Sequence, residues 1–381
     1  MRVGTQTGPA CAGHRRFTLP IRFAQVKKRS PSANKRQTHD DHNPPLSARQ
    51  ATPSARQATP SLVEVRRAAR RGASKPGDPT VSATTTDTLD LMRVATWNVN
   101  SVKQRIPRLL PWLDQRQPDV VCLQETKLSD DAFHDVLGAD LAERGYEIAH
   151  NGQGQWNGVA LLSRVGLDDV QHGFADVPEY DGKVEARAVS AVCGGVRVYS
   201  LYVPNGREPD SPHYIYKLDW LAKLGASIAD PASTMLCGDI NIAPTDADVY
   251  DPASFDGHTH VTAPERDALA ALEALGLTDV VRRRWPGERV YSYWDYRAGM
   301  FHKDLGMRID LILAGSDPAE RTKAAWVDRL ARKGTKPSDH APVIADLDTA
   351  PDGDVGPMVP PPSNPAKRGG KKVPLPQSQD K

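Results

Sequence analysis

The feature that most constrains this chain is one stretch, Thr234-Met-Leu-Cys-Gly-Asp-Ile-Asn241. A short apolar run that ends in turn residues predicts a buried strand. Asp239 and Asn241 are two positions apart, so on an extended strand both side chains project from the same face. A carboxylate and an amide at a strand end suit a hard cation, or a phosphate beside one. Alone, the pattern also fits an Asx turn that closes the strand, so a site is indicated only if other polar residues converge there.

Charge is distributed unevenly along the 381 residues. Residues 1–90 contain 16 Lys and Arg against 6 Asp and Glu, residues 351–381 contain 5 against 3, and the middle contains 28 against 38. The first segment is rich in Ser, Thr, Pro and Arg and carries a tandem repeat over 47–53 and 54–60, and the last is rich in Pro and Lys. Such segments bury too little apolar surface to fold. We predict a disordered basic tail over 1–90, one folded domain over 91–350 and a disordered tail over 351–381.

The basic tail has further interpretations. Its first 39 residues contain Arg and Ser but no acidic side chain, which is also typical of an organelle transit peptide. Alternatively, translation starts at Met92, where the folded pattern begins, and the tail is not part of the protein. A translated tail would add loose, nonspecific affinity for nucleic acid.

The cysteines and the apolar runs indicate a compartment. Three of the four cysteines, Cys122, Cys193 and Cys237, lie in or beside apolar runs, and no Cys-x-x-Cys pair occurs. Buried thiols in a reducing cytosol explain this pattern better than disulfides or zinc. No apolar run approaches the length of a membrane span. We predict a cytoplasmic monomer without a membrane partner, with organelle import as the alternative.

Short strands and helices follow one another between residues 91 and 350. Brief apolar runs and β-propensity predict strands at 93–100, 120–123, 159–162, 235–237, 308–313 and 342–347, and a hairpin at 187–203 around Gly194-Gly195. Helical spacing of apolar residues predicts helices at 103–117, 213–229 and 265–275. Many short strands with a few helices predict an α/β domain in which sheets pack face to face with helices outside.

Polar residues end these strands repeatedly. The strand ends supply Asn98, Glu125, Tyr202 with Asn205, Asp239 with Asn241, Asp310, and Asp339 with His340. Loops at strand ends are where sites are usually built. Carboxylates that meet there would repel one another and be costly to bury, and a divalent cation removes that conflict. An oxygen-rich ligand set favours Mg²⁺ or Mn²⁺ over Zn²⁺, and such an ion suits phosphoryl transfer.

Residues 92–348 resemble the exonuclease III group of the DNase I-like endonuclease/exonuclease/phosphatase superfamily. The motifs that carry the resemblance are Thr96-Trp-Asn-Val-Asn100, Leu123-Gln-Glu-Thr-Lys127, Tyr202-Val-Pro-Asn-Gly206, Gly238-Asp-Ile-Asn241, Tyr293-Trp-Asp-Tyr-Arg297, Arg308-Ile-Asp-Leu311 and Ser338-Asp-His-Ala-Pro342. The resemblance implies a four-layer α/β/β/α sandwich of two mixed β-sheets flanked by helices. It also implies Mg²⁺-dependent DNA repair, with Mn²⁺ as a substitute: cleavage 5′ to abasic sites and 3′→5′ removal of nucleotides or blocking groups from duplex DNA.

The resemblance implies roles for individual residues. Its catalytic set is Tyr202, Asp239, Asn241, Asp310 and His340, and its metal set is Asn98, Glu125, Asp239, Asn241, Asp339 and His340. Glu125 is the principal metal ligand in this assignment, and Asp310 orients the His340 imidazole. The resemblance leaves open whether Asp239 or His340 accepts the proton from water, and whether one metal ion or two act.

A third set of residues is implied to contact DNA. Its members are Arg187, Asn205, Lys217, Tyr293, Trp294 and Asp339. Asn205 stands where many members of the family have Gln, and it also fits a turn cap beside Gly206. Arg187 and Lys217 also fit solvated surface charges, and the two aromatic residues also fit core packing. The partner implied is duplex DNA with abasic sites, nicks or 3′ ends.

Two other functions fit parts of the pattern. A phosphoinositide or sphingomyelin phosphoesterase would share the metal and imidazole chemistry, but the Tyr202 and Tyr293 motifs resemble the DNA-acting branch. A DNA-binding protein without catalysis would not need the full set of strand-end carboxylates. We therefore expect a nuclease. The acidic middle then predicts a polarised surface, with negative charge away from the DNA.

Overall fold

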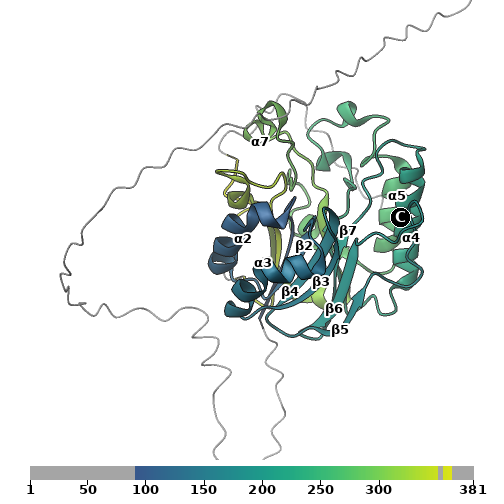
Figure 1. Ribbon diagram of the computed structural model, residues 1–381. Helices are drawn as coiled ribbons and strands as arrows, with labels where there is room; N and C mark the ends of the chain where they lie inside the picture. Colours follow the sequence, from purple (N-terminus) through teal and green to yellow (C-terminus); the bar gives the residue numbers. More distant parts are fainter. Residues whose placement is uncertain (1–90, 351–354, 363–381) are drawn as a thin grey trace, which may run out of the picture. The chain divides into compact units, whose positions relative to one another are not determined.

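The computed structural model describes residues 91–350 and 355–362 (Figure 1). The tails predicted at 1–90, and at 351–354 and 363–381, fall outside the described residues. None of the helices in the described ranges combines the length and the apolar character that a membrane span requires.

The first sheet has seven strands, in the order β13, β11, β12, β1, β2, β4, β3. Their bounds are β1 (Met92–Asn98), β2 (Val120–Gln124), β3 (Glu147–Gln153), β4 (Trp156–Ser163), β11 (Thr322–Asp328), β12 (Val343–Leu347) and β13 (Met358–Val359). β1 lies in the centre, parallel to β2 and antiparallel to β12. The predicted strands at 93–100, 120–123, 159–162 and 342–347 are confirmed here.

The second sheet has six strands, in the order β5, β6, β7, β8, β10, β9. Their bounds are β5 (Asp168–His172), β6 (Ala188–Cys193), β7 (Val196–Tyr202), β8 (Thr234–Asp239), β9 (Thr278–Asp279) and β10 (Asp310–Ala314). β8 lies between parallel β7 and antiparallel β10. The predicted hairpin is β6–β7, and both turn glycines have positive φ (56° and 81°), as a two-residue type I′ loop requires.

Helices cover the outer faces of both sheets (Figure 1). They are α2 (Val102–Arg116) and α3 (Asp130–Glu143) on the first sheet, and α4 (Pro212–Ser227) and α5 (Ala263–Glu273) on the second. Within β1, Val94 packs between the sheets, whereas Ala95 and Trp97 pack under α2. Strands buried on both faces read as continuous apolar runs. The predicted four-layer sandwich of two mixed sheets is confirmed.

Short elements fill the connections between the layers. They are α6 (Val280–Arg284), α7 (Met300–Lys303), α8 (Ser316–Arg321), and the 3₁₀ turns η1 (Asp246–Asp248), η2 (Pro252–Phe255), η3 (Arg297–Gly299) and η4 (Arg329–Arg332). Two of these 3₁₀ turns, η1 and η2, lie between β8 and α5. The segments around η3, α7 and η4 lie close to the site described next.

Part of the segment predicted as a C-terminal tail, residues 358–359, is folded. Met358 and Val359 form β13, which pairs in parallel with β11. The side chain of Met358 is buried in the core between the two sheets. The folded part therefore extends past residue 350, because an apolar residue in the Pro-rich segment closes the edge of the first sheet.

Candidate active site

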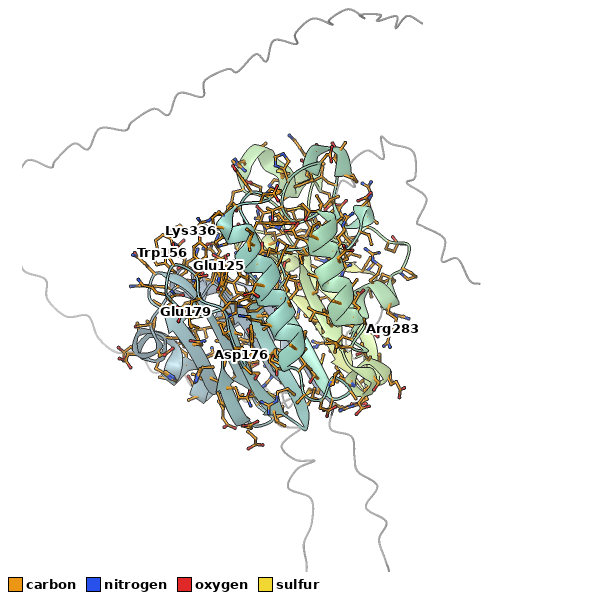
Figure 2. All side chains as sticks on the ribbon, turned by 90° about the vertical axis from the view of Figure 1, so that its right-hand side faces the viewer. Glu125, Trp156, Asp176, Glu179, Arg283 and Lys336 are labelled. Carbon is orange, nitrogen blue, oxygen red and sulfur yellow. The ribbon has the colours of Figure 1, made fainter. Side chains whose placement is uncertain are left out.

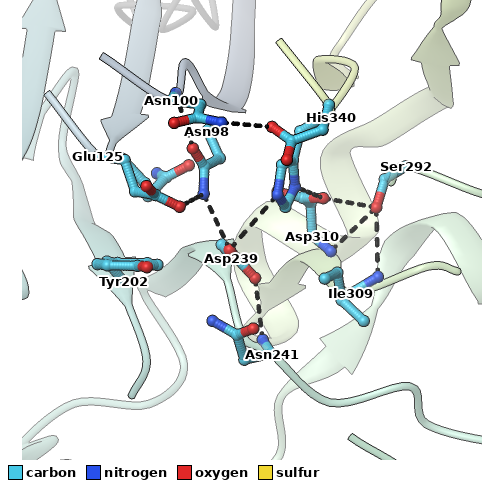
Figure 3. Close-up of polar contacts among 12 residues, drawn as sticks. Asn98, Asn100, Glu125, Tyr202, Asp239, Asn241, Ser292, Ile309, Asp310 and His340 are labelled. Atoms are coloured by element: carbon cyan, nitrogen blue, oxygen red, sulfur yellow. Dashed lines mark hydrogen bonds and ion pairs between the residues drawn. The ribbon is translucent and has the colours of Figure 1, made fainter. Parts of the chain in front are cut away.

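Strand ends from both sheets meet at one place (Figure 3). The residues that meet there are Asn98 and Glu125 from the first sheet, Asp239 and Asp310 from the second, and His340 from the loop before β12. The register explains part of this convergence, because Asp310 at the start of β10 lies directly opposite Asp239 at the end of β8. Trp97 Nε1 donates to the backbone oxygen of His340 (3.2 Å), which ties the loop to β1.

Glu125 directly follows β2 in the left-handed backbone region (φ 52°), a strained conformation that clusters at functional sites. Asn98 Nδ2 donates to Glu125 Oε1 (2.8 Å), and Lys127 Nζ forms an ion pair with Oε2 (2.7 Å). Burial alone would raise the pKa of Glu125, but the Lys127 charge and the Asn98 hydrogen bond outweigh it and hold the pKa below its usual value. Glu125 is therefore ionised at neutral pH, as a metal ligand must be.

Asp239 is buried at the end of β8. Its Oδ2 accepts from Asn98 Nδ2 (3.0 Å), and its Oδ1 accepts from the Asn241 backbone N–H (3.1 Å). Burial raises the pKa of Asp239 to about 7, against the opposing effect of the His340 charge. Gly238 precedes it because a Cβ there would lie 1.9 Å from Leu201 O on β7. Close strand packing thus explains the glycine, and burial gives the aspartate a pKa near neutrality.

His340 is held between two aspartates. Its Nδ1 donates to Asp310 Oδ2 (2.8 Å), and its Nε2 lies 3.8 Å from Asp239 Oδ2. Ser292 Oγ donates to the same Asp310 oxygen (2.6 Å). Burial lowers the pKa of His340, but Asp310 and Asp239 outweigh it and raise the pKa to about 10. The structure thus brings Asp310 and His340 together, with the imidazole as a cation.

Glu125, Asp239 and His340 form a group that could hold a metal ion. One ligand atom of each lies within 4.8 Å of the others. Two carboxylates and an imidazole are donors that divalent metals accept, and carboxylates this close together favour a bound cation. The two carboxylates therefore fit a metal ion, and His340 would join them as a ligand only after losing its proton.

Three predicted metal ligands make other contacts in the structure. The Asn98 amide donates to both carboxylates, and its Oδ1 accepts from the Asn100 backbone N–H (3.0 Å). Asp339 Oδ1 accepts from Asn100 Nδ2 (3.0 Å). The Asn241 side chain donates to the backbone carbonyl that follows β7 (3.0 Å) and accepts from Asn205 Nδ2 (3.3 Å). These hydrogen bonds hold the residues around the site in place. Asn98 aligns the two carboxylates, because its amide donor faces both of them.

Tyr202 lies beside Glu125 (Figure 3), and the guanidinium of Arg187 stacks on the Tyr202 ring. Burial and the Glu125 charge raise the pKa of Tyr202 well above its ordinary value, so its hydroxyl stays protonated and able to donate. Arg187 is buried, pairs with Glu185 (2.6 Å) and stacks at 4.8 Å on the Tyr202 ring. In this structure Arg187 therefore supports Tyr202, and its contact with DNA stays a prediction.

Lys217 is also buried, in contrast to its predicted contact with DNA. Its Nζ donates to Glu265 Oε1 (2.5 Å), Asn241 O (2.7 Å) and Asn205 O (3.2 Å). Neither side chain of the Lys217–Glu265 pair is exposed. Glu265 also belongs to the capping box that begins α5 with Thr262. Lys217 therefore uses all its donors inside the protein and fastens the loops that carry Asn205 and Asn241.

We expect Lys217→Met to lower the free energy of unfolding by about 3 kcal/mol, because it leaves Glu265 as a buried charge without a partner. Urea unfolding measures this loss. The double variant with Glu265→Gln should recover part of it. Lys223→Met is the control, because the Lys223–Asp219 pair on α4 is exposed and such pairs contribute about 1 kcal/mol or less. Equal stability of the Lys217 and Lys223 variants would contradict the assignment.

The remaining predicted DNA contacts differ in their exposure. Trp294 is fully buried, and its Nε1 donates to Asp304 Oδ1 (3.3 Å). In this structure Trp294 packs in the core, and its contact with DNA stays a prediction. Tyr293 is half-buried at the site, with its ring 4.9 Å from that of His340. Asn205 is exposed at the rim, close enough to extend the site.

Sequence reasoning assigned no role to Asn100, Lys127 and Ser292. Lys127 Nζ donates to Asn100 Oδ1 (2.7 Å), so a chain of contacts runs along the rim from Glu125 to Asp339. Asn100 and Lys127 are the last residues of two motifs, which was the available signal. Ser292 carried no such signal in the sequence, because its contact with Asp310 joins segments that are distant in sequence.

Comparisons with known proteins identify the family. A model of the endonuclease/exonuclease/phosphatase family matches residues 95–340. Exodeoxyribonuclease III of Haemophilus influenzae is 28% identical over 271 residues, which cover 67% of this chain and 100% of the relative. The structure of an AP endonuclease from Archaeoglobus fulgidus matches with a TM-score of 0.64 and 37% identity, over 68% of this chain and 100% of that chain.

Two further structures match with 39% identity, the same TM-score and the same coverage: a 3′–5′ exonuclease from Neisseria meningitidis, and a 3′ phosphatase from Neisseria bound to a product DNA hairpin. The family match contains every residue labelled in Figure 3. The chain therefore belongs to the endonuclease/exonuclease/phosphatase family and, within it, to the exonuclease III group of AP endonucleases, which are nucleases of DNA repair.

Proposed function

We propose that this chain is a Mg²⁺-dependent nuclease of duplex DNA, acting as a cytoplasmic monomer. It would cleave the phosphodiester 5′ to abasic sites and remove nucleotides or blocking groups from 3′ ends. The observation that carries the proposal is the group Glu125, Asp239 and His340, with Asp310 behind the imidazole. Relatives named as an AP endonuclease, a 3′–5′ exonuclease and a 3′ phosphatase support these activities.

Mg²⁺ is the ion that best suits this group, with Mn²⁺ as a substitute. Carboxylate oxygens dominate the donors, and hard oxygen donors select these ions. Glu125 and Asp239 would hold the ion, with His340 at its edge. When bound, the ion neutralises charge on the phosphate oxygens.

We assign Asp239 as the general base. Its carboxylate lies 3.8 Å from His340 Nε2, whereas Lys127 forms an ion pair with Glu125, so Asp239 is the carboxylate of this group that is placed to accept a proton from water. His340, as a cation fixed by Asp310, would donate its Nε2–H to a phosphate oxygen through a charge-assisted hydrogen bond. The protonated hydroxyl of Tyr202 would donate to a second oxygen or to the leaving group. Asn98 would keep the two carboxylates apart and aligned.

The test uses the full chain on an abasic duplex and on a blunt duplex, each with Mg²⁺ and with chelator. We expect incision of the abasic duplex and release of nucleotides from the blunt duplex, only with Mg²⁺. An inositol phosphate is the comparison substrate. Turnover of that compound without cleavage of either duplex would reject the proposal in favour of a phosphoesterase.

We expect Glu125→Gln to raise the Mg²⁺ concentration for half-maximal activity by about 10- to 100-fold, because it removes a charged ligand. A Mg²⁺ titration of the cleavage rate measures this shift. Glu179→Gln is the matched control, since Glu179 is exposed and also lies outside the three-residue group (Figure 2). An unchanged Mg²⁺ dependence in Glu125→Gln would remove this residue from the metal site.

A further inference from the structure

A cavity of about 530 Å³ lies beside the catalytic loop. Residues 295–302, with η3 and part of α7, form one wall, and residues 329–337, which lead to the catalytic loop, form the other. The titratable lining residues are mostly basic: His302, Arg329, Arg332 and Lys333. The acidic lining residue, Asp295, is already bound through both carboxylate oxygens by Arg297. The cavity therefore carries a net positive charge.

Arg332 is buried at this cavity without a counter-ion. Its side chain donates to Trp294 O (3.1 Å), and its Nε is buried without a hydrogen-bond partner. Among the residues that the structure describes, no carboxylate forms an ion pair with Arg332, whereas the neighbouring Arg329 pairs with Asp304 (3.1 Å). A buried guanidinium without a counter-ion is costly. Its place at the edge of a cavity indicates that an anion completes the site.

Aromatic rings fix both guanidinium groups. The guanidinium carbon of Arg332 lies 5.1 Å from the ring centre of Tyr296 and 4.9 Å from that of Phe301. That of Arg329 lies 4.5 Å from the Phe301 ring. Stacking of this kind orders the planar groups before a ligand arrives and so lowers the entropic cost of binding. Arg329 is neutralised by Asp304, so the fixed guanidinium of Arg332 and the nearby Lys333 are the groups that suit the oxygens of a phosphate.

Tyr296 links the cavity to the catalytic loop. Its hydroxyl donates to Pro337 O (3.0 Å) and lies 3.5 Å from Asp339 Oδ1. Its ring is 49% exposed, and an exposed aromatic face suits a sugar or a base. Lys336, from the same wall, lies on the same side of the molecule as Glu125 (Figure 2). A ligand in the cavity would therefore lie next to the catalytic residues without occupying their place.

We propose that this cavity is a second phosphate-binding site, in which Arg332 and Lys333 bind the phosphate of a nucleotide and Tyr296 packs against its sugar or base. The anion site stands on the contacts above, and only its assignment to a nucleotide rests on the proposed function. The phosphate belongs either to the DNA strand beyond the cleavage position or to a released nucleoside 5′-monophosphate. The volume is within the range of small-molecule sites.

The anion site is tested on the full chain without metal, in the presence of chelator, by thermal unfolding in inorganic phosphate and in chloride of equal ionic strength. We expect phosphate to raise the melting temperature of the wild type, because it binds the folded state. Arg332→Gln should weaken the apparent phosphate affinity by about tenfold or more. It should not lower the melting temperature in chloride, because it removes a buried charge that lacks a partner.

Two further variants keep this test decisive. Lys333→Gln changes a half-buried side chain and should weaken phosphate binding less than Arg332→Gln does. Arg283→Gln is the control, since Arg283 lies on the opposite side from Glu125 (Figure 2), and its phosphate response should match the wild type. Wild-type responses in both Arg332→Gln and Lys333→Gln would overturn the site. An unstable Arg332→Gln together with a wild-type response in Lys333→Gln would show that Arg332 is structural, and would also overturn it.

A deoxynucleoside 5′-monophosphate and a duplex with a recessed 3′ end distinguish the two sources of phosphate. If DNA supplies it, Arg332→Gln lowers the slope of log affinity against log salt by about one and raises KM at unchanged kcat. If the released nucleotide supplies it, mononucleotide binding weakens while the salt slope stays the same. A chain that cleaves no DNA would contradict the proposed function, but the response to inorganic phosphate needs no turnover and would still decide the anion site.

Discussion

Asp239→Asn is expected to lower the rate of abasic-site cleavage by about 10³-fold or more, because the amide keeps the shape of the carboxylate but cannot accept a proton. Single-turnover rates on an abasic duplex at saturating Mg²⁺ measure the loss. Asp176→Asn is the matched control, because Asp176 is exposed and does not belong to the group Glu125, Asp239 and His340. A rate within tenfold of the wild type would assign the base to another residue.

The same substitution is expected to stabilise the metal-free chain at neutral pH. Burial raises the pKa of Asp239 from 3.8 to about 7. A carboxyl whose pKa is raised on folding contributes stability that is complete below its unfolded value and is lost as the pH rises through its folded value. Between about pH 4 and 7 the wild type should therefore lose stability relative to Asp239→Asn, in urea unfolding with chelator. If the free energy of unfolding depends on pH in the same way in the wild type and in Asp239→Asn, burial does not raise the pKa of this carboxylate.

Burial of Asp239 at the end of an apolar strand lowers stability but serves activity. The same burial made the site predictable from the sequence. Apolar strands buried on both faces leave polar residues conspicuous at their ends, and Asn98, Glu125 and Asp239 each follow or end such a run. Strand register then places Asp310 opposite Asp239. Convergence of these residues therefore follows from local patterns plus the sheet order. The family resemblance implied two mixed sheets, but the order of their strands was not predicted.

Elements without a buried local pattern were not predictable. α3 is anchored by Phe133, Leu137 and Leu141, which are four positions apart, but Gly138 and several acidic residues dilute this apolar stripe. All five residues of β5 are exposed, so no alternation marks it as a strand. β5 is held at the edge of its sheet by its pairing with β6, a tertiary contact that the local sequence does not encode.

The burial of Lys217 and Arg187 was not predictable, because it depends on contacts between segments that lie apart in the sequence. Lys217 pairs with Glu265, 48 positions away, and neither neighbourhood identifies the other. Arg187 has its partner, Glu185, two positions away, but its burial depends on stacking against Tyr202 on a neighbouring strand. Charged residues are mostly exposed in proteins. Sequence reasoning therefore places such side chains on the surface and predicts that they contact the substrate.

Asp310→Asn is expected to lower the cleavage rate by about 10²- to 10³-fold. In the wild type Asp310 Oδ2 accepts from His340 Nδ1 (2.8 Å) and from Ser292 Oγ (2.6 Å). An amide carries no charge to stabilise the imidazolium, and its N–H groups favour the opposite tautomer of the imidazole. Single-turnover rates at saturating Mg²⁺ separate this effect from metal affinity.

The variant should also change how stability depends on pH in the metal-free chain. Burial lowers the pKa of His340, but Asp310 and Asp239 outweigh it and raise the pKa from 6.5 to about 10. The resulting stability is complete below about pH 6.5 and is lost as the pH rises through 10. Without the Asp310 charge the folded pKa falls, so Asp310→Asn should be less stable than the wild type through this window. Urea unfolding with chelator at several pH values measures the difference.

Ser292→Ala separates the position of Asp310 from its charge. It removes the hydroxyl that donates to Asp310 Oδ2 and accepts the backbone N–H groups of Ile309 (3.2 Å) and Asp310 (3.1 Å), but it keeps the carboxylate. We expect a rate loss of about tenfold with the pH–stability profile of the wild type. If Asp310→Asn also keeps that profile, the Asp310 charge does not hold His340 as a cation. A neutral imidazole would then be free to accept the proton from water, and the base would be His340 in place of Asp239.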